Sequence, residues 1–110
     1  MWRNKKLRRS VPDLKKQLSV GFALILYVRA TGRQQLRTAI ATRCPDFLPE
    51  QAERGLQKRP MKKGLINYYE FDEHGNDLGW RSFYAHRIVG WAAWDWNVDS
   101  MPKITNVELE

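Results

Sequence analysis

Phe22-Ala-Leu-Ile-Leu-Tyr-Val28 is the longest apolar run in this chain of 110 residues, and its conformation decides the fold. The branched and aromatic side chains favour a strand, although a helix continuing from the preceding residues fits the same letters. We expect a strand, which in front of later helices suits an α+β arrangement of helices on a sheet. The run is far shorter than the ~20 apolar residues that cross a bilayer, so no membrane span is expected.

The chain before this run is basic and then helical. Residues 1–11 are rich in Lys and Arg and are expected to form a basic arm, followed by one compact α+β domain over 12–110. Pro12 and Asp13 are typical of a helix start. Leu14 and Leu18 share one helical face, which predicts a helix over about 12–19.

Two more helices are expected after the run. Residues 33–43 place Leu36 and Ile40 on one helical face, and Pro45 ends that pattern. A second pattern over 49–59 begins with Pro49 and is limited by Pro60.

From residue 65 the apolar period changes to two. Residues 65–71 and 80–86 alternate on either side of the polar loop 72–77, which predicts an antiparallel hairpin. A further strand over 88–96 is expected to bend at Gly90, and an edge strand is expected around 104–109. The fold class is therefore two to three short helices followed by a hairpin or small sheet, either winged-helix-like or helix-on-sheet.

The helix pair followed by the hairpin resembles a winged helix-turn-helix from Arg33 to about His86. The resemblance implies that the helix over 49–59 reads a nucleic-acid groove and that residues 71–80 form the wing. Gly55 departs from that pattern, because glycine weakens a recognition helix.

Charge is divided unequally between the two halves. Residues 1–63 hold 16 of the 19 Lys and Arg and only four acids, whereas residues 64–110 hold three basic residues and eight acids. Such polarity favours a face that binds a polyanion, here DNA or RNA, and predicts a small nucleic-acid-binding regulator. The expected phosphate contacts are Arg3, Lys5, Lys6, Arg8, Arg9, Lys15, Lys16, Arg54, Lys58, Arg59, Lys62 and Lys63.

The aromatic second half supports an alternative function. A protein-protein interaction module, acting as an adaptor or inhibitor, would use exposed Trp80, Trp94 and Trp96 to bind an acidic or tryptophan-recognising protein. A homodimer is also considered, formed by pairing of strand 22–28 across the dimer axis.

No catalytic motif is present, so we expect neither an enzyme nor a cofactor. His86 and Arg87 are expected to be neighbours in a strand and to face opposite sides, which argues against a ribonuclease site built on both. The lone Cys44 makes no internal disulfide, and with His74 and His86 it does not complete a zinc site. A reducing cytoplasm is the expected location.

Overall fold

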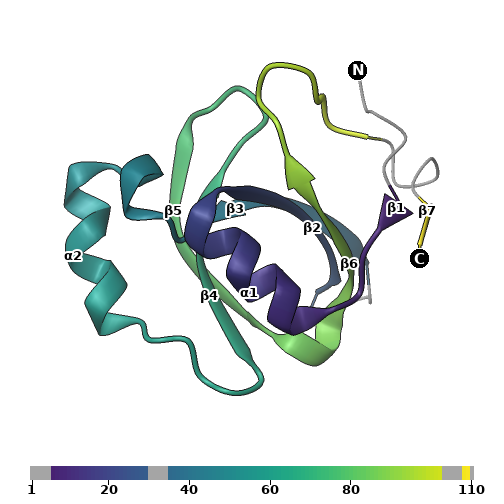
Figure 1. Cartoon of the computed structure of the whole chain (residues 1–110), viewed down its shortest axis with the longest axis horizontal. Helices are drawn as coiled ribbons and strands as arrows, with labels where there is room; N and C mark the ends of the chain where they lie inside the picture. The colour runs from purple at the N-terminus through teal and green to yellow at the C-terminus, as the bar shows by residue number, and fades with distance from the viewer. Residues whose placement is uncertain (1–5, 30–34, 103–107, 110) are drawn as a thin grey trace.

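The computed structural model describes residues 6–29, 35–102 and 108–109. Its centre is a curved antiparallel sheet in the order β5-β4-β3-β2-β6 (Figure 1). Within the described residues no ladder joins the edge strands β5 and β6, so the sheet curls without closing into a barrel. The strands are β2 (Phe22–Val28), β3 (Leu36–Thr42), β4 (Leu65–Phe71), β5 (Asp77–Tyr84) and β6 (Ile88–Trp94).

The apolar run forms β2, the central strand, and this confirms the strand predicted from its composition. Its edges pair with β3 on one side and β6 on the other, and four of its side chains are buried. Because both of its edges are already paired, β2 has no free edge for a second copy of the chain. The prediction of a homodimer formed by pairing of residues 22–28 is therefore wrong. The bend expected at Gly90 coincides with a register shift, since Leu26 faces Gly90 while Tyr27 faces Ile88.

The helix predicted over 33–43 is wrong: residues 36–42 form β3, and residues 33 and 34 lie outside the described part of the chain. β3 pairs with β2 along its whole length, from Phe22 with Thr42 to Val28 with Leu36. The spacing of four between Leu36 and Ile40 fits one face of a strand as well as one face of a helix, so the pattern alone did not discriminate. Without this helix, residues 33–59 do not form a helix-turn-helix, and the winged-helix resemblance is not confirmed.

Helix α1 (Val11–Val20) covers the concave face of the sheet (Figure 1). It begins at Ser10, whose hydroxyl accepts a hydrogen bond from the Asp13 amide at 3.3 Å, and has Pro12 in its first turn. Leu14 and Leu18 are fully buried, as the helical spacing predicted. They pack on alternate residues of the strands, namely Ala23, Ile25, Ala39, Ala41, Ile66, Tyr68, Phe83 and Trp91.

Helix α2 (Glu50–Lys58) confirms the helix predicted over 49–59, and it lies on the opposite face of the sheet from α1. The short η1 turn (Pro45–Phe47) precedes it. Ala52 and Leu56 pack inward on the other set of strand residues, which includes Leu24 and Tyr69. The two helices therefore cover opposite faces, each over its own apolar cluster.

The hairpin of β4 and β5 confirms the alternation read from the sequence, with Leu65 opposite Tyr84 and Asp72–Asn76 in the connecting turn. β5 ends at Tyr84, and η2 (Ala85–Arg87) links it to β6. The placement of His86 and Arg87 in a strand is therefore wrong.

Two short strands complete the described chain. β1 (Lys6–Leu7) pairs in parallel with β7 (Glu108–Leu109), and Arg8 bridges to Trp91 of β6 through two backbone hydrogen bonds. Leu7, within the segment expected to form a basic arm, is fully buried. The expected edge strand around 104–109 is described only at residues 108–109. None of the described helices is long and apolar enough to cross a membrane.

Candidate functional site

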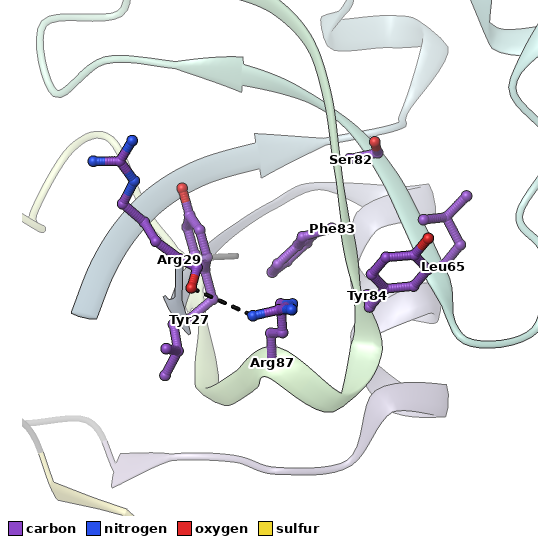
Figure 2. Close-up of a pocket in the computed structure, with 8 residues that line it drawn as sticks. Tyr27, Arg29, Leu65, Ser82, Phe83, Tyr84 and Arg87 are labelled. Carbon is purple, nitrogen blue, oxygen red and sulfur yellow. Dashed lines mark hydrogen bonds between the residues drawn. The ribbon is translucent and has the colours of Figure 1, made fainter. Parts of the chain in front are cut away.

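A pocket of about 310 Å³ opens between the end of β2 and the end of β5, beside η2 (Figure 2). We call it the mouth pocket. Its volume is at the lower end of the range of about 300–1,000 Å³ that is usual for small-ligand sites. Its walls are formed by Tyr27, Val28, Arg29, Leu65, Ser82, Phe83, Tyr84 and Arg87.

Aromatic rings form the inner wall of the mouth pocket. Phe83 meets Tyr27 with ring centroids 4.9 Å apart and Tyr68 with centroids 5.0 Å apart, both in edge-to-face geometry. Alternation places these three side chains on the concave face of β5, β2 and β4. The rings therefore extend the core below α1 outward to the pocket.

The outer rim carries one exposed ring. Tyr84 is 56% exposed and stacks on His86, with centroids 5.8 Å apart and an interplanar angle of 20°. Tyr84 extends to the other side of β5 from Phe83, toward Leu65, so its exposed ring lies apart from the rings at the base (Figure 2).

Arg87 brings its guanidinium into the mouth pocket, whereas Arg29 faces Arg87 with its carbonyl oxygen and extends its guanidinium away (Figure 2). Arg87 is half-buried, points toward Tyr27, and donates from Nη1 to the Arg29 carbonyl oxygen at 3.3 Å (Figure 2). Its Nε is buried and has no hydrogen-bond acceptor within the described residues. A buried donor without an acceptor is costly, and because solvent does not reach this Nε a ligand does not reach it either; an anion would meet the Nη end of the guanidinium.

The nearest ionisable groups lie deeper along the concave face. Burial raises the pKa of Tyr27, and the Glu70 carboxylate raises it further. Burial likewise raises the pKa of Tyr68. Burial also raises the pKa of Glu70, an effect that the Arg81 guanidinium at 3.4 Å partly offsets. Neither Arg29 nor Arg87 forms an ion pair with a carboxylate in the described chain, so the mouth pocket keeps a net positive charge.

The basic residues that the sequence predicted to contact phosphate lie in several places, and the structure does not bring them together into one site. One group lies on or beside α1 and consists of Lys6, Arg8, Arg9, Lys15 and Lys16. In this group Arg8 forms an ion pair with Asp13, and its guanidinium carbon lies 4.8 Å from the Trp91 ring centroid. Arg3 and Lys5 are outside the described residues.

The remaining residues predicted to contact phosphate lie on the face of the sheet opposite α1 or beside the mouth pocket. Arg54 and Lys58 are exposed on α2, and Arg59 ends that helix against Trp80. Lys62 and Lys63 precede Gly64, whose carbonyl accepts from the Ala85 amide at 2.8 Å, so this turn lies beside η2. Since α1 and α2 cover opposite faces, one flat ligand cannot reach both groups at once.

Of the three tryptophans proposed for partner binding, Trp94 is buried, and Trp80 and Trp96 are half-buried. Trp94 is 6% exposed and packs edge-to-face on Trp96, which is half-buried. Trp80 is half-buried beneath α2. A partner would therefore not meet these rings as a protruding surface.

Sequence reasoning missed the residues of the mouth pocket. Arg29 and Arg87 are 58 positions apart, and they meet only because β2 lies between β3 and β6. The one local feature of the sequence that could have indicated this pocket was the presence of Tyr84 and Arg87 close together at the end of the predicted hairpin. No group of three or more His, Cys, Asp or Glu side chains suited to a metal ion occurs among the described residues.

Comparison with known proteins gives a family and a fold description. The family model described as WYL_2, Sm-like SH3 beta-barrel fold, matches residues 11–89, from the start of α1 to the first residues of β6. The structure agrees with this description in its five-stranded antiparallel sheet but leaves the barrel open. No curated protein matches the chain, and no solved structure matches it.

Proposed function

The chain belongs to the WYL_2 family, and from the mouth pocket we propose that it binds single-stranded nucleic acid. The family description names a fold, and a fold alone does not define a function. The proposal therefore depends on the chemistry of the pocket.

One observation carries the proposal: the Arg87 guanidinium forms no ion pair among the described residues and lies in a pocket whose walls hold two arginines and no acid. A phosphate oxygen would accept a hydrogen bond from the Nη end of that guanidinium and neutralise its charge. Arginine pairs with phosphate through charge-assisted hydrogen bonds, which are stronger than neutral ones. The chain's net charge of +7 would add a long-range attraction for a polyanion.

The aromatic walls support a base beside that phosphate. Tyr27 and Phe83 lie at the base of the pocket, and the exposed ring of Tyr84 lies across β5 from them. Stacking of bases on aromatic side chains is how single-stranded nucleic acid is commonly bound without sequence preference.

A single strand suits this geometry better than a duplex. The pocket is recessed between strand ends, and a base reaches such a site only after leaving its stack. A duplex groove is usually read by a projecting helix, and residues 33–59 do not form the helix pair that would present one.

The experiment is fluorescence anisotropy with labelled single-stranded RNA, single-stranded DNA and duplex DNA at two salt concentrations. We expect the single strands to bind more tightly and the affinity to fall with salt, because phosphate neutralisation releases counterions. Arg87→Gln should weaken binding by about 2 kcal/mol, or ~30-fold, the usual size of a hydrogen bond to a charged group.

Arg9→Gln is the matched control, because it removes the same charge from an exposed residue that does not line the pocket. Thermal melting of both variants checks that the fold is retained. Equal losses for Arg9→Gln and Arg87→Gln, or a preference for duplex, would refute the mouth pocket as the binding site.

A further inference from the structure

A second group of arginines surrounds Trp80 on the convex face of the sheet. The Arg59 guanidinium carbon lies 5.1 Å from the Trp80 ring centroid, and that of Arg43 lies 5.9 Å from it. Attraction between each cation and the ring holds the guanidinium groups in place. Trp80 therefore acts as a support that orients two positive charges.

These two charges are not neutralised within the described residues, where neither Arg59 nor Arg43 forms an ion pair. Arg43 donates to the Asn67 carbonyl oxygen at 2.9 Å and is half-buried, and its burial lowers its pKa. Arg59 donates a hydrogen bond to the Gly55 carbonyl oxygen at 3.4 Å, in addition to its contact with the Trp80 ring. Positive charge is thus held close to an apolar ring, where an anion would gain more than it would in bulk water.

An open pocket of about 310 Å³ lies beside this cluster. Its walls are Arg59, Asn67, Trp80, Arg81 and Ser82, and we call it the Trp80 pocket. None of its walls is acidic, although Glu70 forms an ion pair with Arg81 from the neighbouring strand. The side chains offer two guanidinium groups, an amide and a hydroxyl, which together suit phosphate oxygens.

The Trp80 pocket adjoins the mouth pocket, since Ser82 lines both. Both pockets lie along β5, an edge strand of the sheet. Trp80 and Tyr84 are four residues apart on that strand, which separates their Cα atoms by about 13 Å. A ligand spanning both pockets must therefore be longer than the group that fills one.

We propose that the Trp80 pocket is a second phosphate subsite, and that a single strand crosses β5 from the mouth pocket to reach it. This inference rests on the proposed function, because the mouth pocket holds the first nucleotide. The second subsite recognises the sugar-phosphate backbone through Arg59, Arg81 and Ser82. It therefore adds affinity without adding base preference.

The test is a length series of uniform single-stranded oligonucleotides, from a mononucleotide to a ten-nucleotide strand, bound to the wild-type protein and to Arg59→Gln. Arg54→Gln is the control: it removes an equal charge from an exposed position on the same helix that does not line the Trp80 pocket. Each binding curve is measured at several salt concentrations.

We expect wild-type affinity to rise stepwise once the strand reaches the second subsite. Arg59→Gln should remove that step, weaken long strands roughly tenfold and lower the salt slope by about 0.7, the value for one phosphate contact on a single strand. It should leave the mononucleotide affinity unchanged. Arg54→Gln should keep the step.

Two results would overturn the inference in distinguishable ways. If the mononucleotide binds but affinity does not step with length, or if Arg59→Gln behaves as Arg54→Gln does, the second subsite is refuted and the mouth pocket stands. If the wild-type protein binds no strand of any length, the proposed function fails and the second subsite fails with it.

Discussion

Replacing Gly55 by alanine sets helix propensity against packing. In an exposed helix this change stabilises by about 1 kcal/mol, because glycine loses more backbone entropy on folding. Here a Cβ at position 55 would lie 2.6 Å from the Trp80 Nε1 atom and 2.6 Å from an Arg59 guanidinium nitrogen. The Arg59 end can move, but the indole is held between α2 and the sheet.

Overpacking of this kind costs about 1–3 kcal/mol, so after the propensity gain we expect Gly55→Ala to destabilise the protein by about 1 kcal/mol. For a domain of this size that corresponds to a fall in Tm of roughly 5 °C. Urea denaturation and thermal melting followed by circular dichroism measure both quantities. Gln57→Ala, at an exposed position of the same helix, is the control and should change stability little. An increase in stability for Gly55→Ala would refute the close packing of Trp80 under α2.

Two further predictions address the core and the charge of the concave face. Leu14→Ala should destabilise the protein by about 3 kcal/mol, because the side chain is fully buried under α1 and its removal leaves a cavity; denaturant titration measures this, and a loss below about 1 kcal/mol would contradict the packing. Glu70→Gln should raise the affinity for single-stranded RNA severalfold at pH 7, because it removes the carboxylate that offsets Arg81. Burial raises the pKa of Glu70, so in the wild-type protein this carboxylate takes up a proton as the pH falls through that raised value, and affinity should increase there. The difference in affinity between wild type and Glu70→Gln should therefore narrow on acidification. A difference that stays constant in anisotropy titrations between pH 7 and pH 4 would contradict the assignment.

Local patterns predicted much of the fold. The spacing of Leu14 and Leu18, the residues around Pro49, and the alternation on both sides of the 72–77 loop identified α1, α2 and the β4–β5 hairpin. β3 was missed because apolar residues four apart fit both a helix and a strand. Pairing with β2 decides between them, and that pairing joins segments that local periodicity does not connect.

The candidate site was much less accessible to sequence reasoning. Counting Lys and Arg identified a basic protein, but charge totals do not say which side chains meet. The mouth pocket depends on a contact between Arg29 and Arg87, and on the ring contact of Tyr27 with Phe83, both of which join distant segments. The tryptophan-rich half was conspicuous in the sequence, yet its rings mostly fill the second apolar cluster beneath α2.

The division of basic residues between two faces has a consequence for binding. α1 and α2 cover opposite sides of the sheet, so the Lys15 and Lys16 pair and the Arg54 and Lys58 pair cannot act on one short ligand together. The mouth pocket lies between the strand ends and is bounded by neither helix. A ligand held there would use the charges on the helices only as a diffuse attraction.

The most direct test of the mouth pocket is an NMR titration of the ¹⁵N-labelled protein with a short single-stranded oligonucleotide, following the side-chain Nε–H resonance of Arg87. We predict that this resonance shifts on binding, together with the backbone amides of Tyr27, Ser82 and Tyr84, because a phosphate bound at the Nη end changes the surroundings of the whole guanidinium. Shifts confined to α1 around Lys15 and Lys16, with the Arg87 Nε–H unchanged at saturation, would contradict the account.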